Sequence, residues 1–262
     1  MNEAIIQLRG VHKAFGGRKV LNGVDLDIER ERSTVVIGMS GSGKSVLLKC
    51  ILGLEKPDAG EITLDGENWL SLSSERQLER MHRVGMLFQG AALFDSLPVW
   101  QNVAFALLHR GESATTARAR AAEVLAWVGL PDVEEKMPAE LSGGMAKRVG
   151  LARAICHRPD IIFFDEPTTG LDPMMADVIN RLIVKLKTES RITAVSITHD
   201  MKSARMIADS IAMLYQGRIH RQISPMQIDS DRDPILRQFI DGLAEGPIPL
   251  NGDTAGGEGV TA

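Results

Sequence analysis

The stretch from Val35 to Cys50, VVIGMSGSGKSVLLKC, constrains the fold more than any other part of the chain. An apolar run stops at a glycine, small residues follow, and a lysine and a serine precede a helical pattern. The loop fits G-x-x-x-x-G-K-[ST], in which glycines let backbone N–H groups wrap phosphate oxygens. The positive end of the following helix favours the same anion. The residues expected to bind nucleotide here are Gly38, Met39, Ser40, Gly41, Ser42, Gly43, Lys44, Ser45 and Val46.

Within this loop, Lys44 is expected to bridge the terminal phosphates and Ser45 to ligate Mg²⁺. Val46 occupies a position where a second hydroxyl is common, so one phosphate hydrogen bond is expected to be missing. The alternative is a tight glycine-rich turn with an exposed lysine. Eight matching positions between a predicted strand and a predicted helix favour the phosphate loop.

A second element of the same site is predicted in IIFFDE, residues 161–166. Four apolar residues bury a strand and leave Asp165 and Glu166 at its carboxyl end, where ligands bind in such sheets. Asp165 is expected to hold Mg²⁺ through water, and Glu166 to polarise the attacking water. Alone this pattern is weak, because acidic residues often follow strands; together with the phosphate loop it becomes strong evidence, but only for the binding of a nucleoside triphosphate.

The order of predicted elements indicates an α/β fold. Strands are predicted in 4–11, 24–29, 33–38, 60–67, 83–89, 161–166, 192–200 and 210–217, and helices in 44–54 and 173–187. From about residue 90 to 158 the pattern becomes helical, so a helical subdomain interrupts a mainly parallel sheet. A short helical segment is predicted in 233–246, and the Gly-rich end from residue 251 is predicted to be disordered.

Composition excludes several classes of protein. A net charge of -4 over 262 residues gives no basic field of the kind that nucleic-acid binding needs. Cys50 and Cys156 lie far apart in predicted helices and are interpreted as reduced core thiols. No apolar stretch approaches the roughly 20 residues of a membrane span, and the N-terminus lacks the apolar core of a signal peptide. We therefore expect a cytoplasmic chain.

A more specific motif, LSGGM, lies between the two site elements. Ser142, Gly143 and Gly144 form a second phosphate-binding helix N-terminus, with Ser142 suited to an N-cap. One chain has little use for two such sites on one γ-phosphate unless one of them serves a partner.

The set of motifs, in this order, resembles the ATPase cassette of ABC transporters. The resemblance covers residues 4–223 and implies an ATPase with a RecA-like core, an antiparallel β subdomain and an inserted helical subdomain. It places the cassette at 4–225, with the helical subdomain at 90–158, and a C-terminal extension at 226–262. It also implies that ATP and Mg²⁺ bind between two copies of the chain, each LSGGM motif closing on the other copy's nucleotide.

Four further residues take their roles from this resemblance. Phe15 would stack on adenine, Gln89 would touch Mg²⁺ and water, Asp172 would contact the second copy, and His199 would hold the γ-phosphate and Glu166. Each has a simpler alternative: core packing for Phe15, a strand-end cap for Gln89, a helix N-cap for Asp172, and a purely structural role for His199. Met145 stands where the family motif ends in glutamine; the Ser-Gly-Gly that meets phosphate is intact, so binding across the dimer should survive.

Three segments are similar to one branch of the family, the cassettes that serve permeases of MCE-domain lipid carriers, with the Mla phospholipid system nearest. They are FQGAALFDSLPVWQNVAFAL with ELSGGMAKRVGLARAI, and the tail RQFIDGLAEGPIPL, which resembles an extension that reaches the second copy. The branch implies an inner-membrane permease, an MCE-domain protein and a small STAS-domain protein as partners, and a position on the cytoplasmic face of the inner membrane. The segment after Gln89 would accept the permease's coupling helix; packing within the helical subdomain is the alternative.

Other classes fit less well. Another ABC importer or exporter remains an alternative, as does a P-loop NTPase outside transport. A P-loop kinase has no use for LSGGM or His199. An SMC-type repair ATPase needs a long coiled coil between its halves, and a translation-factor ABC protein carries two cassettes in one chain.

Overall fold

The computed structural model describes residues 3–249. Within them the chain divides into two compact units, one ending at Pro225 and the other beginning at Met226. The segment from residue 251 onward, for which disorder is predicted, lies outside the described residues.

The larger sheet of the first unit is mainly parallel and runs in the order β10-β9-β3-β8-β7-β6. Only β10, on one edge, pairs antiparallel with its neighbour. Every residue of β3 and β8 is buried, as the apolar runs of strands covered on both faces predict. The prediction of a mainly parallel sheet is confirmed. Its strands are β3 (Ser33–Ile37), β6 (Val84–Leu87), β7 (Ile161–Asp165), β8 (Thr193–Thr198), β9 (Ser210–Tyr215) and β10 (Arg218–Ile223).

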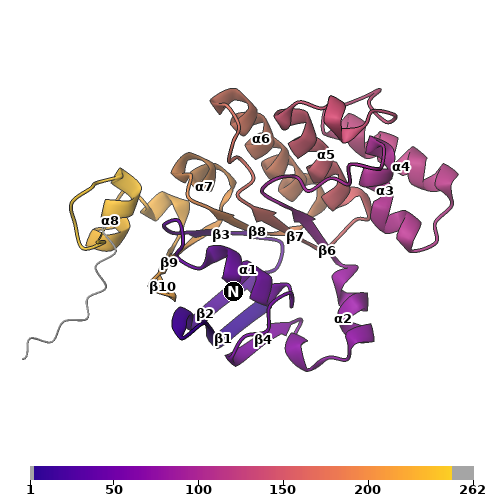
Figure 1. Ribbon diagram of the computed structural model, residues 1–262. Helices are drawn as coiled ribbons and strands as arrows, with labels where there is room; N and C mark the ends of the chain where they lie inside the picture. The colour runs from indigo at the N-terminus through magenta and orange to yellow at the C-terminus, as the bar shows by residue number, and fades with distance from the viewer. Residues whose placement is uncertain (1–2, 250–262) are drawn as a thin grey trace, which may run out of the picture. The chain divides into compact units, whose positions relative to one another are not determined.

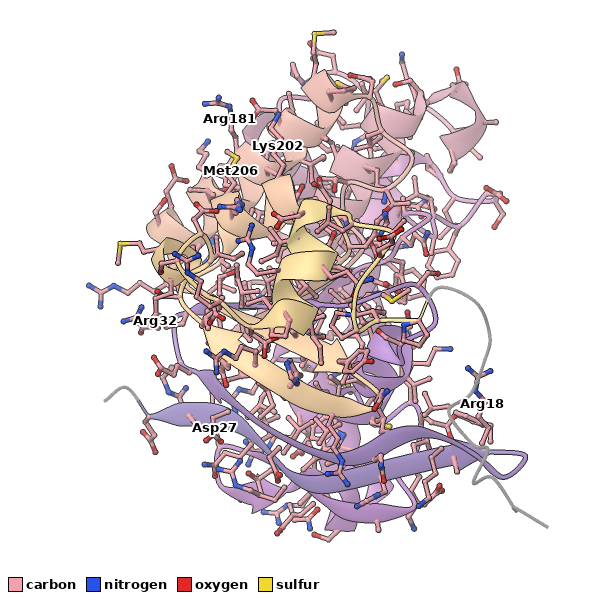
Figure 2. The ribbon with its side chains drawn as sticks, turned by 90° about the vertical axis from the view of Figure 1, so that its left-hand side faces the viewer. Arg18, Asp27, Arg32, Arg181, Lys202 and Met206 are labelled. Carbon is pink, nitrogen blue, oxygen red and sulfur yellow. The ribbon has the colours of Figure 1, made fainter. Side chains whose placement is uncertain are left out.

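The second sheet is antiparallel, in the order β2-β1-β4-β5. Its first two strands form a long hairpin with several register shifts along β1. Figure 2 shows Arg18 and Asp27 toward opposite ends of β2. The predicted antiparallel β subdomain is confirmed. Its strands are β1 (Ala4–Phe15), β2 (Arg18–Glu29), β4 (Ala59–Leu64) and β5 (Glu67–Asn68).

The helices form layers on the larger sheet (Figure 1). Helix α1 packs between the two sheets, where Leu47 and Leu48 share a core with Ile62 and Phe163. Helices α6 and α7 lie on the opposite face, and α3, α4 and α5 form the inserted helical subdomain. In the first unit the helices are α1 (Lys44–Ile51), α2 (Ser74–Met81), α3 (Val99–His109), α4 (Ala114–Trp127), α5 (Gly143–Cys156), α6 (Pro173–Ser190) and α7 (Met201–Ile207). Short 3₁₀ turns cover Trp69–Ser71, Pro138–Glu140 and Pro225–Gln227.

The expectation of helix from residue 90 is wrong for the first nine residues. Ala91 and Ala92 have φ values of 60° and 49°, which no right-handed helix permits. Side chains hold this loop instead: Asn102 accepts from the Phe94 N–H at 2.7 Å, and the Arg153 guanidinium donates to the Ala91 and Ala92 carbonyls at 2.6 Å. These nine residues therefore form a loop that side chains of α3 and α5 hold in place, and not a helix.

The sequence-based prediction lacks α2, α7 and β10. In α2 the exposed residues predominate, so no apolar face marks it, although Ser73 caps its N-terminus by accepting from the Arg76 N–H. Strand β10 is an edge strand, and only Ile219 and Ile223 interrupt its polar sequence. Helix α1 ends at Ile51, three residues before the predicted end.

The second unit contains helix α8 (Pro234–Asp241), inside the segment where a short helix is predicted. Asp233 caps it by accepting from the Leu236 N–H at 2.8 Å, and Gly242, with φ 65°, ends it. The buried Gln238 side chain donates to the Ile248 carbonyl and accepts from the Ile248 N–H, so the chain after the helix folds back on it.

Two other sequence-based expectations can be compared with the structure. Cys50 and Cys156 are buried and free, as expected for reduced core thiols. Within residues 3–249, no helix combines the length and apolar character needed to cross a bilayer.

Two glycines in left-handed conformations provide a test of packing in the antiparallel sheet. A Cβ at Gly60 would lie 2.2 Å from the Gly10 carbonyl oxygen, whereas at Gly66 it would meet open space. Gly66→Ala should cost about 1 kcal/mol of backbone strain. Gly60→Ala adds a collision with backbone, for a total of about 3 kcal/mol. Urea denaturation of the two variants measures the difference, and equal losses of unfolding free energy would contradict this packing.

Candidate functional site

The phosphate loop joins β3 to α1, and close contacts require glycine at two of its positions. A Cβ on Gly38 would lie 2.5 Å from the Leu214 carbonyl oxygen. Gly43 has φ 102°, and a Cβ there would approach Val20 to 3.0 Å. Helix α1 begins at Lys44, directly after the loop, so its unpaired N–H groups point toward the loop. The local sequence therefore builds an anion-binding turn.

Lys44 folds back onto its own loop. Its ammonium donates to the Gly38 and Met39 carbonyls at 2.8 and 3.0 Å, and only 7% of the residue is exposed. Burial lowers the pKa of Lys44, while the charges of Glu166 and Asp165 act in the opposite direction. Binding of a phosphate would replace the two carbonyls as acceptors for this ammonium.

The other loop side chains differ in exposure. Ser40, Gly41 and Ser45 are exposed, whereas the Ser42 hydroxyl is buried and has no hydrogen-bond partner in the described part of the chain. Val46 packs against the hydrophobic core, so the position without the second hydroxyl contributes to packing.

Asp165 and Glu166 end β7 and begin the next loop, as predicted. Glu166 is 9% exposed, and its Oε2 accepts from the Thr169 and Thr198 hydroxyls at 3.1 and 3.3 Å. Burial raises the pKa of Asp165, and the charge of Glu166 raises it further, while nearby lysines lower it. One oxygen of Asp165, Oδ1, is buried and has no hydrogen-bond partner among residues 3–249.

His199 follows β8, the strand that pairs in parallel with β7. Its Nδ1 lies 3.0 Å from Glu166 Oε1, and more than half of its side chain is exposed. The structure therefore brings the predicted acid pair and the predicted histidine together at the carboxyl ends of neighbouring strands.

The remaining predicted residues, Gln89, Phe15 and Asp172, lie at or beside the ends of strands and helices. Gln89 is exposed just after β6, the neighbour of β7. Phe15 is 47% exposed at the end of β1, which contradicts core packing for this ring. Asp172 is the N-cap of α6 and accepts from the Met174 and Met175 N–H groups at 3.0 Å, so its helix-capping alternative is correct.

Ser142, Gly143 and Gly144 open helix α5. The Ser142 side chain caps the helix by accepting from the Met145 N–H at 3.3 Å, as predicted, and Ser142 and Gly143 are exposed. Gly144 lies against Met175 of α6, where a Cβ would approach the sulfur-bound methyl to 2.7 Å. Helix α5 lies in the helical subdomain, and α1 lies beneath the larger sheet (Figure 1), so the two phosphate-binding turns occupy different parts of the fold.

The acidic residues suit a metal that is shared with a ligand. Among the residues that the structure describes, no group of three or more His, Cys, Asp or Glu side chains could hold a metal ion alone. Mg²⁺ commonly takes one or two protein oxygens and completes its shell with phosphate and water. The unpartnered Asp165 Oδ1 and the exposed Ser45 hydroxyl fit that requirement.

Comparison with protein families identifies the chain. The model of the ABC transporter family matches residues 21–169, a range that includes the phosphate loop, Ser142 and both carboxylates. The chain belongs to the ABC transporter family. It is an ABC ATPase with the cassette fold, and both predictions from the sequence are confirmed.

Several individual ABC proteins are similar to nearly all of this chain. The chain is 39% identical over 247 residues to the intermembrane phospholipid transport system ATP-binding protein MlaF of Escherichia coli (strain K12), covering 94% of this chain and 92% of that one. It is 37% identical to protein TRIGALACTOSYLDIACYLGLYCEROL 3, chloroplastic, of Arabidopsis thaliana, over 94% of this chain and 76% of the relative. It is also 37% identical to the probable ribonucleotide transport ATP-binding protein mkl of Mycobacterium leprae, over 94% and 71%.

Solved ABC structures share the fold. The ATP-binding cassette MJ0796, in a dimeric post-hydrolysis state bound to ADP and Pi, has a TM-score of 0.77 and 32% identity, covering 84% of this chain and 98% of that one. CbiO1 of Clostridium perfringens, part of an ABC transporter complex, has a TM-score of 0.80 and 28% identity, covering 88% and 92%.

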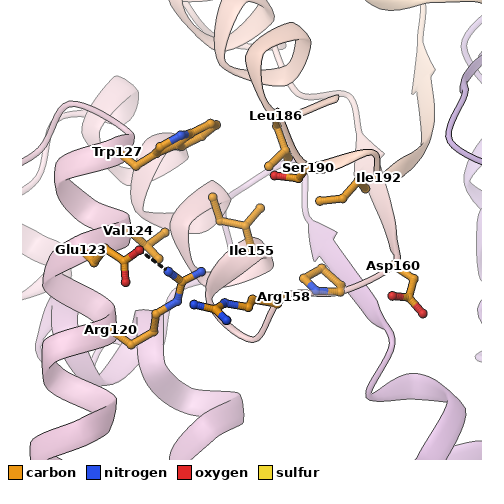
Figure 3. A pocket seen from close by; sticks show the side chains of 11 residues that line it. Arg120, Glu123, Val124, Trp127, Ile155, Arg158, Asp160, Leu186, Ser190 and Ile192 are labelled. Carbon is orange, nitrogen blue, oxygen red and sulfur yellow. Dashed lines mark ion pairs between the residues drawn. The ribbon is translucent and has the colours of Figure 1, made fainter. Parts of the chain in front are cut away.

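The ABC cassette also contains a cavity of about 460 Å³, and neither the phosphate loop nor the pair Asp165 and Glu166 lines it (Figure 3). Asp160 precedes β7 and Ile192 precedes β8, so this cavity lies where the parallel strands begin. Arg120 on its wall is paired with Glu123 at 2.7 Å. Nucleotides bind at the opposite, carboxyl ends of such strands, so we assign the site to the phosphate loop.

Three side chains around Glu166 escaped the sequence analysis: Thr169, Thr198 and Lys147. The threonines donate to the Glu166 carboxylate, and the Lys147 ammonium donates to its backbone carbonyl at 3.3 Å. The sequence contains one indication of a buried Lys147, because this lysine lies on the apolar face of α5 with Gly150 and Leu151. The sequence contains no such indication for the two threonines, since their contacts with Glu166 depend on the pairing of β7 with β8.

The raised pKa of Asp165 predicts a stability effect with a definite sign. A carboxyl whose pKa is raised on folding destabilises the folded protein while it is ionised. Asp165→Asn should therefore raise the melting temperature of the nucleotide-free protein at pH 7 by about 2–4 °C, the range for about 1 kcal/mol in a chain of this size. The gain should shrink as the pH falls from the raised pKa toward the ordinary value of 3.8, because the folded wild-type carboxyl becomes neutral before the unfolded one does.

Differential scanning calorimetry from pH 4 to pH 8 measures this gain. Asp95→Asn, a change at an exposed carboxylate, is the control and should leave the melting temperature within about 1 °C. A lower melting temperature for Asp165→Asn at pH 7 would show that this carboxylate stabilises the empty site.

Proposed function

We propose that this chain is the ATP-hydrolysing subunit of a phospholipid transport system and works as a homodimer on a partner permease. The observation that carries the proposal is the similarity to MlaF, which extends over nearly the full length of both chains. The resemblance of the segments after Gln89 and around α8 to that branch supports it. The proposed position is the cytoplasmic face of the inner membrane.

The site within one chain is incomplete for the proposed reaction. The exposed N-terminus of α5 offers Ser142, Gly143 and Gly144 to an anion, yet α5 belongs to a different part of the fold from the phosphate loop. A second copy, placed head to tail, would bring its α5 to the γ-phosphate held by the first. The dimeric MJ0796 structure supports this arrangement, and Asp172 is proposed to contact the second copy beside it.

The proposed chemistry begins when ATP enters the loop and Phe15 stacks on the adenine. Lys44 leaves the Gly38 and Met39 carbonyls for the terminal phosphates. Glu166 polarises the attacking water, while Thr169, Thr198 and His199 hold its carboxylate in place. Mg²⁺, held through Ser45, Gln89 and Asp165, would neutralise the charge that develops on the phosphates. Hydrolysis would then separate the two copies and reset the transporter.

The proposed contact with the permease lies near the loop after Gln89. Phe88, Phe94 and Phe105 are exposed aromatic side chains, and the Phe94 and Phe105 rings lie 4.6 Å apart. Exposed apolar groups that gather in one place are typical of protein interfaces. An MCE-domain protein and a small STAS-domain protein are proposed as further partners from the Mla resemblance.

Replacing the proposed base should separate ATP binding from hydrolysis. Glu166→Gln removes the group that accepts the proton of water but leaves the phosphate loop intact. We expect turnover to fall at least 100-fold and an ATP-bound dimer to accumulate, measured by phosphate release and by light scattering after size exclusion. Adding Ser142→Arg should abolish the dimer, because the long arginine side chain would block the second phosphate site.

Turnover of Glu166→Gln near the wild-type rate would remove Glu166 from the role of base. A stable ATP-bound dimer of the double variant would contradict the shared site.

The permease contact is tested by Phe94→Glu combined with Phe105→Glu. Charges in place of the exposed rings should reduce co-purification with the co-expressed permease at least tenfold and leave ATP binding to the isolated chain within about twofold. Met226→Glu, a change at an exposed apolar residue of the second unit, is the control. Unchanged recovery of the complex would remove this surface from the interface.

The nature of the cargo is tested on the purified complex and in the genome. Phospholipid that co-purifies, identified by mass spectrometry of the extract, would support the proposal, as would neighbouring genes for a permease and an MCE-domain protein. Ribonucleotide in the extract would favour the function named for mkl. A neighbouring gene for a periplasmic solute-binding protein would favour another ABC importer.

A further inference from the structure

Lys147 is a buried lysine one turn beyond the start of α5. Only 5% of the residue is exposed, and its ammonium donates to the Glu166 carbonyl oxygen at 3.3 Å. The sequence motif that identifies the phosphate-binding turn stops at Met145, so Lys147 lies outside it. A buried ammonium requires compensating charge or hydrogen bonds, and its surroundings show what supplies them.

Two carboxylates compensate the charge of this ammonium. Burial lowers the pKa of Lys147 and of Lys44, the lysine of the phosphate loop, and the charges of Asp165 and Glu166 oppose that change in both lysines. The acid pair is therefore shared by two buried lysines from different elements. Lys44 has to move to the phosphates when nucleotide binds, whereas Lys147 has no part in the phosphate loop and can remain with the pair.

The backbone at Glu166 needs support. Its φ is 48°, a left-handed conformation that is uncommon for a residue with a side chain and that persists only where neighbours hold it. The Glu166 N–H donates to the Ile197 carbonyl at 2.9 Å, and its own carbonyl accepts from the Thr169 N–H at 3.2 Å and from Lys147. Lys147 is the member of this set that comes from α5.

Resting on the proposed function, we propose that Lys147 is a positioning residue that couples α5 to the catalytic carboxylate of its own chain. The first turn of α5 carries Ser142, which would bind the nucleotide of the second copy. The next turn carries Lys147, which holds Glu166 for the nucleotide of its own copy. A shift of α5 on closure is then transmitted directly to Glu166, and each chain's helix links the two sites of the dimer.

The alternative is that Lys147 merely fills space. Methionine has a similar length and no charge, so Lys147→Met keeps most of the packing and removes the ammonium. Arginine keeps a cation and donors. A packing role predicts that methionine is tolerated better than arginine, and a positioning role predicts the reverse order.

The experiment compares steady-state ATP hydrolysis by the full-length wild type, Lys147→Met and Lys147→Arg. We expect Lys147→Met to lower kcat at least tenfold with KM for ATP within about threefold, because the phosphate loop is untouched. Lys147→Arg should retain at least a third of wild-type kcat. If the methionine variant does not fold, Lys147→Gln, which keeps a donor without the charge, should show the same loss of kcat.

Arg148→Met is the matched control on the same helix. Arg148 also donates to a backbone carbonyl, that of Gly129 at 2.9 Å, but this contact lies in the helical subdomain. Its loss should lower the melting temperature and leave kcat within about twofold. A wild-type kcat in Lys147→Met would overturn the proposal. An equal loss of kcat in Lys147→Met and in a folded Lys147→Arg would overturn it as well.

A double-mutant cycle with Glu166→Gln separates a role through Glu166 from an independent one. In that background, adding Lys147→Met should change the residual single-turnover rate less than twofold. A further loss equal to that in the wild type would overturn the proposal. Full activity of Glu166→Gln would contradict both the assignment of Glu166 as the base and the inference about Lys147. An inactive Glu166→Gln together with a fully active Lys147→Met would contradict only the inference about Lys147.

Discussion

The parallel pairing of β7 with β8 is the constraint on which the site depends. Asp165 pairs with Ile197 in this register, so Glu166 emerges next to Thr198 and His199. The pairing of β3 with β8 places Ile37, the last residue before the phosphate loop, beside the same Thr198. A change of one residue in either register would turn the polar side chains away from one another. The buried apolar runs that fix these registers are therefore as necessary for function as the polar residues.

Charge at this edge is balanced within the chain. Asp165 and Glu166 follow one another and repel, and buried ammonium groups from the phosphate loop and from α5 compensate them. Removing one of the buried ammonium groups would leave the two carboxylates without this compensation, which destabilises more than the pair itself stabilises. The site is thus held in place before nucleotide arrives, at the expense of buried charge, as is common where binding requires a preformed arrangement.

Much of this arrangement follows from sequence because its motifs are local. The phosphate loop, the acid pair and Ser142 each lie within a few residues, and their side chains are directed by the strand or helix that they adjoin. Contacts across elements are not local: Thr198 and Lys147 reach Glu166 only after strands and helices pack. Loop 91–98 shows the same limit, since Asn102 and Arg153 replace backbone hydrogen bonds that the helical pattern predicts.

Helix α5 unites the local and the non-local parts of the site. Its N-terminus is exposed, and Gly144 packs against Met175 so closely that the helix position is tied to α6, which Asp172 caps. Its second turn contacts the backbone of Glu166. If ligand binding at the N-terminus of α5 alters the contact of Lys147 with Glu166, as we propose, linkage requires nucleotide binding beside Glu166 to alter binding at that N-terminus by an equal free energy. The binding free energies of the two sites would then depend on each other.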